Sequence, residues 1–200
     1  METDRTYTAF VGARLIATGD VKTMLLQTKE CLDRGETDPV LIFEDQTGKQ
    51  IDFDFHGTPD EVLAKLSSHP LFAAAEPQKT GPGRPKLGVV CREISLLPRH
   101  WEWLEQQPSG ISATLRRLIE DARKQNKGKD QARMARDAAG KFMWAMAGNL
   151  PDFEEASRAL FAGDFERLGQ LIRDWPKDIR EYVERLVMEA VRFDSDPDPS

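Results

Sequence analysis

The feature that most constrains this chain is a stretch rich in proline and glycine, Ser67 to Gly88, about a third of the way along its 200 residues. Four prolines and three glycines fall within it. Proline lacks an amide hydrogen and clashes with a preceding helical turn, so regular elements are not expected to continue through the stretch. We therefore expect an N-terminal domain at residues 6–67, a basic linker at residues 68–86, and separate folded parts after it.

The N-terminal part alternates between strand and helix patterns. Residues 8–16 indicate a hairpin around Gly12, and residues 21–32 indicate a helix capped by Asp20. Residues 40–43 form a short apolar run, and residues 50–55 alternate apolar and acidic side chains with a period of two, as strands do. A second helix is expected where Thr58, Pro59 and Glu61 match a capping box. The order predicts a small β-β-α-β-β-α sandwich.

The remainder of the chain has a different pattern. Residues 87–126 indicate a strand at 89–97, a helix at 99–107 that Pro98 opens, and a helix at 113–124 capped by Ser112. A polar break is expected at residues 125–129, followed by a C-terminal helical bundle at residues 130–192. Residues 193–200, rich in Asp, Ser and Pro, are expected to be a disordered tail. The fold class is therefore α+β.

The charges are segregated along the chain. The whole chain has a net charge of −6, which by itself argues against a polyanionic partner. Residues 79–136, however, hold 13 basic and 6 acidic residues and are +7, which leaves −13 for the rest. Such asymmetry suggests that the middle meets a polyanion or the acidic parts of the protein itself. The alternative is that these side chains only solvate helix faces.

No catalytic pattern is found. The three histidines, His56, His69 and His100, lack the spacing of zinc ligands, and no phosphate-binding glycine motif occurs. Asp52 and Asp54 share one face of a predicted strand, where paired carboxylates could serve a metal or a hydrolase, or simply be solvated. We expect no enzyme, no cofactor and no metal site.

The compartment is expected to be the cytoplasm. No apolar run approaches the roughly 18 residues that a membrane-spanning helix needs, and the acidic start does not match a signal peptide. Cys31 and Cys91 are far apart in sequence and are expected to be free thiols.

The clearest binding pattern is a strand, a proline-opened helix, a glycine-containing turn and a second helix. It runs through Arg92 to Pro98, Trp101 to Leu104, Gly110 to Ser112, and Leu115 to Ile119. Over about 35 residues this resembles the ribbon-helix-helix family of bacterial DNA-binding proteins. The resemblance implies a homodimer whose paired strands lie in the major groove of double-stranded DNA. The strand departs from the pattern of that family in two ways. It is unusually apolar, and Arg92 and Glu93 point to opposite faces, which leaves open the face that meets DNA.

The same resemblance assigns candidate DNA contacts. Arg92 would read bases, because a guanidinium can bond two acceptors of guanine, and the amides near Ser112 could hold a phosphate. A second signal, Gly83 to Lys86, is similar to the Gly-Arg-Pro core of AT-hooks, although Pro82 replaces the arginine that often flanks it. The predicted contact set comprises Arg84, Lys86, Arg92, Arg99, Ser112, Arg116, Arg117 and Lys124.

Taken whole, the chain also resembles an uncharacterised bacterial group, domain-of-unknown-function family 2239. The residues that carry this likeness are Tyr7 to Gly12 with Leu15 and Ile16, Gly83 to Val90, Leu96 to Leu104, and Phe161 to Asp164. This resemblance implies no activity, substrate or catalytic residue.

The sequence thus predicts a DNA-binding protein, a dimeric transcriptional regulator that uses a ribbon-helix-helix-like element and a basic arm. The alternative is a protein-interaction or oligomerisation module with no role in nucleic-acid binding. Arginines of residues 87–126 that are buried and paired with Asp or Glu would favour the alternative.

Overall fold

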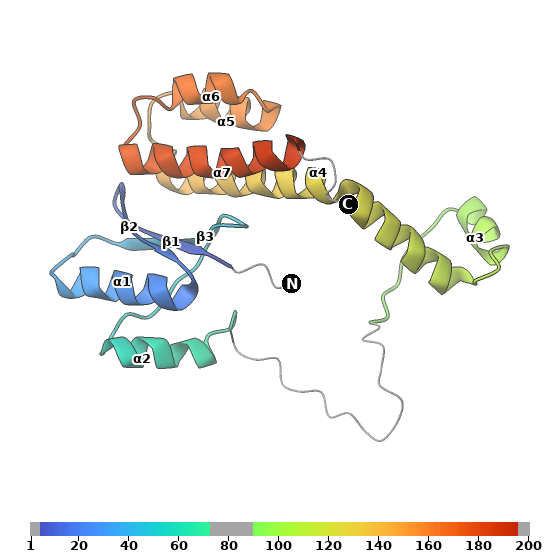
Figure 1. The fold of residues 1–200 in the computed structure, drawn as a ribbon, viewed down its shortest axis with the longest axis horizontal. Coiled ribbons are helices and arrows are strands. Elements are labelled where there is room, and N and C mark those ends of the chain that lie inside the picture. Colours follow the sequence, from blue (N-terminus) through green and yellow to red (C-terminus); the bar gives the residue numbers. More distant parts are fainter. Residues whose placement is uncertain (1–4, 73–89, 196–200) are drawn as a thin grey trace. The chain divides into compact units, whose positions relative to one another are not determined.

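The computed structural model describes residues 5–72 and 90–195 (Figure 1). Contacts divide the chain into two compact units, residues 73–126 and all the rest. The elements, in chain order, are β1 (Tyr7–Val11), β2 (Arg14–Gly19), α1 (Val21–Asp33), β3 (Val40–Glu44), β4 (Lys49–Gln50), α2 (Pro59–Ala64), the 3₁₀ helix η1 (Lys65–Ser68), α3 (Pro98–Glu105), α4 (Ile111–Ala147), α5 (Phe153–Ala162), α6 (Phe165–Leu171) and α7 (Lys177–Ser195). The α+β class and the β-β-α-β-β-α order of the N-terminal part are confirmed.

Local sequence signals account for the ends of these elements. Gly12, at φ +55°, makes the tight turn between β1 and β2. Asp20 caps α1 by accepting hydrogen bonds from the amides of Lys22 and Thr23. Thr58 and Glu61 form the predicted reciprocal capping box at the start of α2. These caps satisfy amides that the first turn of a helix leaves without partners.

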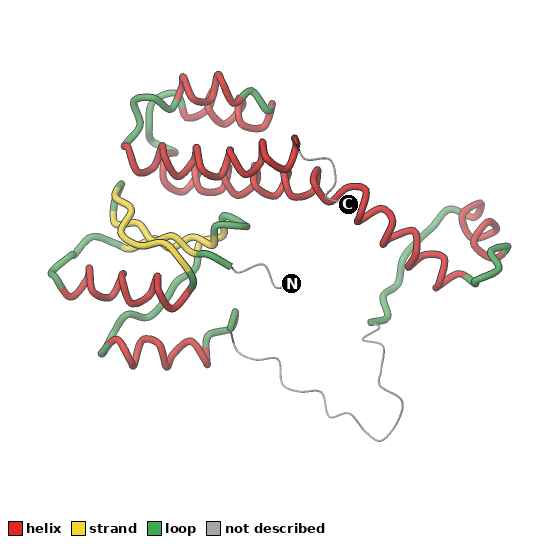
Figure 2. Tube along the Cα trace, in the orientation of Figure 1, coloured by secondary structure: helices red, strands yellow, loops and turns green. Residues whose placement is uncertain are grey.

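The four strands form one antiparallel sheet in the order β2-β1-β3-β4. Side chains of β1 alternate between its two faces, as strand geometry requires. Tyr7 and Ala9 join the core beneath α1 and α2, whereas Phe10 joins the core formed with the C-terminal helices. Figure 2 shows the strands between α1 and α2 on one side and α4 and α7 on the other.

The larger core is built around aromatic rings. Phe142 of α4 lies 5.2 Å from Phe10, 5.0 Å from Phe43 and 4.3 Å from Tyr182 of α7, measured between ring centroids. All four side chains are buried. Each such ring removes 150–250 Å² from water, so this cluster is a large part of the force that holds the helices on the sheet.

A buried carboxylate links the sheet to α7. Asp45, directly after β3, accepts hydrogen bonds on Oδ1 from the hydroxyls of Thr8 and Tyr182, both at 2.8 Å. Its Oδ2 accepts from the Thr6 hydroxyl at 2.8 Å and lies 3.3 Å from the Arg185 guanidinium. A buried carboxylate is tolerated only when its charge is compensated in this way. Burial and the adjacent Asp45 charge hold the pKa of Tyr182 well above its usual range, so its hydroxyl stays a donor.

The turn between β3 and β4 lies against α4 at very close range. Gly48 has φ +63°, and a side chain there would come 2.4 Å from the carbonyl oxygen of Ala138. Lys141 donates to the carbonyl of Thr47 at 3.0 Å beside this contact. Only glycine meets both the backbone and the space requirement at this position.

The sequence placed residues 6–67 and 130–192 in separate domains, but the structure joins them around one core. The stretch rich in proline and glycine indicated only where regular elements stop along the chain. It carried no signal of which elements pack together, because contacts such as Lys141–Thr47 and Tyr182–Asp45 join residues 94 and 137 positions apart.

Two sequence predictions of element bounds are corrected. The break at residues 125–129 does not exist, since α4 runs without interruption for 37 residues. Those five residues include no proline, and lysine and glutamine are good helix formers, so the one glycine costs only about 1 kcal/mol. Of the strand predicted at residues 50–55, only Gln50 belongs to β4. The Ile51 amide adds one hydrogen bond to the Ile42 carbonyl, and the chain then leaves β3.

No helix in the described residues is both long and apolar enough to cross a membrane.

We predict that the hydroxyl of Tyr182 stabilises the fold through Asp45. Tyr182→Phe should lower the free energy of unfolding by about 1–3 kcal/mol, because it leaves a buried acceptor short of a partner. In an Asp45→Ala background the same change should cost much less. Urea unfolding of the four proteins measures this coupling. Equal costs in both backgrounds would show that the two groups act independently.

Candidate nucleic-acid interface

The described part of the second unit is a coil followed by two helices. Pro98 occupies the first position of α3, where a missing amide hydrogen costs nothing. Gly110, at φ +75°, forms the turn into α4, and its carbonyl accepts from the Thr114 amide at 3.0 Å. The buried Thr114 hydroxyl also meets that of Ser109 at 2.9 Å. With buried Leu104, these contacts define the α3–α4 hairpin.

The strand predicted at residues 89–97 is described from residue 90 onward, and residues 90–97 form no strand with any other described residue. Leu97 has an extended backbone at φ −67° and ψ 149°. A strand without a neighbour leaves its main-chain groups unpaired, so a ribbon requires a second strand, from the same chain or from a second copy. The predicted pairing therefore stays a prediction, and Arg92 is exposed in this coil.

Four basic side chains gather on one side of α4. At about 100° per residue, Arg116, Arg117, Arg123 and Lys124 fall within an arc of roughly 120°. All four are exposed. We call this set the basic face. The apolar residues Leu115, Leu118, Ile119 and Ala122 fall on the opposite side of the same helix.

Most of these charges have no acidic partner. Arg123 forms an ion pair with Glu120 at 2.9 Å, and the Arg116 Nε donates to the Ser112 carbonyl at 3.1 Å. Among residues 5–72 and 90–195, none of Arg92, Arg99, Arg117 and Lys124 forms an ion pair. The basic face is thus available to an external anion.

Of the other predicted DNA contacts, the structure describes some and not others. Arg99 is exposed in the first turn of α3, and Ser112 is exposed in the first turn of α4. Ser112 is not the cap that the sequence predicts, because the helix begins one residue earlier, at Ile111. Arg84 and Lys86 lie outside the described residues. Arg123 was missed from the predicted contacts, although helical periodicity places it beside Arg116.

The apolar side of the hairpin is only partly covered. Leu118 and Ile119 of α4 are 42% and 55% exposed, and Trp103 of α3 is 47% exposed. Ile94 and Leu97 of the preceding coil are also exposed. One exposed apolar residue is ordinary, but several within so short a segment indicate a surface for a partner.

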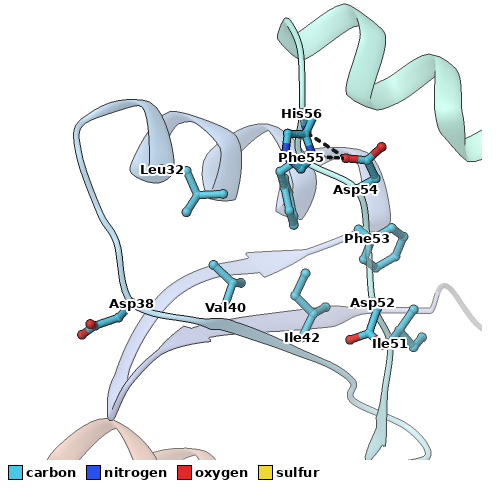
Figure 3. A pocket seen from close by; sticks show the side chains of 10 residues that line it. All are labelled: Leu32, Asp38, Val40, Ile42, Ile51, Asp52, Phe53, Asp54, Phe55 and His56. Carbon is cyan, nitrogen blue, oxygen red and sulfur yellow. Dashed lines mark hydrogen bonds and ion pairs between the residues drawn. The ribbon is translucent and has the colours of Figure 1, made fainter.

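Asp52 and Asp54 do not converge on a common point (Figure 3). Asp54 bonds Lys65 Nζ through Oδ2 at 2.7 Å and His56 Nδ1 through Oδ1 at 2.7 Å. The Lys65 hydrogen bond, followed by the amide and ring of His56, holds the pKa of Asp54 well below its usual range. Within the described chain no three His, Cys, Asp or Glu residues are grouped as metal ligands.

Comparison with known proteins gives one family. Residues 6–187 match a family described as uncharacterized protein conserved in bacteria, DUF2239. Neither the curated proteins nor the solved structures contain a match. The match spans both units and attaches no chemistry to any residue.

We predict that Lys65 sets the ionisation of Asp54. Lys65→Met should raise the pKa of the Asp54 carboxyl toward its ordinary value, because the strongest hydrogen bond to the charged form is removed. Since this pKa is depressed in the folded state, the interaction stabilises the fold above the unfolded pKa and is lost as pH falls. Carboxyl carbon NMR titration measures the change, with Lys49→Met as the control. An unchanged Asp54 titration would contradict the assignment.

Proposed function

The chain belongs to the uncharacterised bacterial family DUF2239, and we propose that it binds double-stranded DNA as a homodimer and regulates transcription. The observation that carries the proposal is the basic face of α4: four exposed cations on one side of a helix, of which only Arg123 has an acidic partner among the described residues.

The basic face suits a phosphate backbone. At 1.5 Å per residue, Arg116 to Lys124 span about 12 Å of helix axis, over which a duplex presents several phosphates. Because the helix fixes the spacing of the side chains, little order has to be gained on binding. Arg99, at the start of α3, adds a further exposed cation from the same unit. These groups would position the protein on DNA without reading its sequence.

We assign sequence selectivity to the coil at residues 90–97 and to the basic arm predicted at residues 68–86, both of which precede α3 in the sequence. Arg92 is the proposed base reader, and Arg84 and Lys86 are proposed to enter a groove beside it. Residues 73–126 hold nine basic and six acidic residues, whereas the rest of the chain is −9. The acidic remainder would limit non-specific attraction to DNA.

The interaction-module alternative has less support. Arginines of residues 87–126 that are buried and paired with acids would favour it. In the described part of this segment every arginine is exposed, and only Arg123 has an acidic partner. Exposed, unpaired arginine is the arrangement that a phosphate-binding surface needs.

A homodimer would cover what the single chain leaves open. Residues 90–97 have no strand partner in the described part of the chain, and Leu118 and Ile119 present an apolar stripe opposite the basic face. Pairing two coils and burying two stripes would satisfy both sets of groups at once. The basic faces would then stay on the outside of the dimer.

We predict a steep salt dependence of binding to random-sequence duplex. Fluorescence anisotropy should give a slope of about −4 or steeper for log affinity against log salt, since each neutralised phosphate contributes about 0.9. The double substitution Arg116→Gln and Arg117→Gln should make the slope shallower by about 1.8.

The matched control is Arg158→Gln with Arg167→Gln, which removes the same charge from acid-paired arginines of the other unit. It should leave the slope unchanged. Absence of binding at low salt would refute the DNA proposal, and equal effects of the two double variants would refute the assigned surface.

We predict that the apolar stripe of α4 forms the dimer. Ile119→Glu should convert a dimer to a monomer in sedimentation velocity and weaken DNA binding, because a charge would be buried between chains. Met188→Glu, at a 70% exposed position of α7, should change neither property. A wild-type protein that is monomeric at tens of micromolar would argue against the dimer.

A further inference from the structure

The outer edge of β3 is only half paired. Its inner edge pairs with β1 along all five residues, but its outer edge pairs with β4 only at Phe43 and Glu44. One more bond follows, from the Ile51 amide to the Ile42 carbonyl at 2.9 Å. In an antiparallel ladder alternate residues face the same neighbour, so the main chain of Val40, two residues from Ile42, faces the open side.

The chain that would complete this edge is held away from it. After the Ile51 bond, residues 52–56 run toward α2 without pairing to any described strand. His69 bonds the Asp52 carbonyl through Nε2 at 3.2 Å, and the Phe53 ring stacks on the His69 ring at 5.1 Å. The Leu71 amide donates to His69 Nδ1, so Nε2 carries the proton and is the donor to Asp52.

A second set of contacts holds the later residues of this segment, 54–56, away from β3. Lys65 Nζ bonds both the Asp54 carboxylate at 2.7 Å and the His56 carbonyl at 2.8 Å. Together with His69, this lysine fixes residues 52–56 to α2 and η1 rather than to β3. The opening is therefore built by specific contacts and is a regular feature of the fold.

The result is a slot of about 440 Å³ between β3 and residues 51–56 (Figure 3). Val40 and Ile42 line it from β3, Leu32 from α1, and Phe53 and Phe55 from the opposite wall. Its volume lies within the range of ligand pockets, which is about 300–1,000 Å³. An apolar slot beside a free strand edge is the setting in which proteins bind extended peptides as an added strand.

The acidic side chains at the slot determine which kind of peptide it would favour. Asp38 and Asp52 lie at its two ends, with Val40 and Ile42 between them (Figure 3). Neither carboxylate forms an ion pair with any described residue, whereas Asp54 is already paired with Lys65. An incoming strand would therefore be favoured if it carried lysine or arginine and disfavoured if it carried acids.

We propose that this slot binds an extended segment of a partner protein in which basic and apolar residues alternate. The main chain of the segment pairs with the free edge of β3 at Val40. Its apolar side chains enter between Val40, Ile42 and Phe53, and its cations meet Asp38 and Asp52. This site lies in the first unit and does not depend on DNA binding.

The test uses the full chain, labelled with nitrogen-15, and a blocked seven-residue peptide of alternating lysine and valine. The peptide should shift the amide signals of Val40, Ile42 and Phe53. The same peptide with glutamate in place of lysine should not bind. A fully N-methylated lysine–valine peptide keeps the charge but cannot donate main-chain hydrogen bonds, and it should also fail to bind.

Variants separate this site from general attraction to an acidic protein. Asp38→Asn with Asp52→Asn should weaken the lysine–valine peptide by about two- to thirtyfold, as expected for the loss of two exposed ion pairs. The control Asp137→Asn with Asp174→Asn removes the same charge elsewhere and should leave the affinity unchanged.

Several results would overturn the proposal. These are unshifted β3 amides, equal binding of the lysine and glutamate peptides, equal binding of the N-methylated peptide, or equal effects of the two aspartate pairs. Shifts of the Val40 amide that depend on protein concentration, without peptide, would identify a second copy of the chain as the occupant instead.

Discussion

The fold of the larger unit depends on one buried carboxylate. Asp45 follows β3 directly and is buried, where an unpaired charge would be strongly destabilising. Three hydroxyls and one guanidinium compensate it, and two of these groups, on Tyr182 and Arg185, come from α7. Because these partners are directional, they fix where α7 lies on the sheet. The neighbouring aromatic cluster supplies more free energy but accepts many arrangements, so the polar contacts select the one that is observed.

The N-terminal elements were predictable because their signals are local. Capping by Asp20 and Thr58, and the turn at Gly12, each depend on residues within a few positions. The strand at residues 50–55 was overestimated for a physical reason. Ile51, Phe53 and Phe55 are more buried than the residues between them, as the alternation predicts. The segment nevertheless does not continue as a strand beside β3. Alternating burial therefore indicates an extended segment packed on a core. It does not indicate that the segment is hydrogen-bonded to a neighbouring strand.

Long-range features were out of reach of local patterns. Nothing near Asp45 in sequence indicates Tyr182. The polar run at residues 125–129 permits a helix by composition, but it lacks the apolar periodicity that would predict one. For the candidate interface, the helix predicted at residues 113–124 already separates the basic residues of α4 from its apolar stripe, whereas the exposure of both sets follows only from the structure. The opening beside β3 was also not predictable, because it is produced by His69 and Lys65, which the sequence places in unrelated elements.

The 137 positions that separate Asp45 from Tyr182 have a consequence for how the protein is made. A ribosome adds about 5–20 residues each second, so Tyr182 emerges roughly 7–27 s after Asp45. During that interval the sheet can gather α1 and α2, but the face that bears Phe10 and Phe43 has no cover. The nascent chain therefore presents an aromatic surface for seconds, and exposed apolar surface of this kind is prone to aggregate.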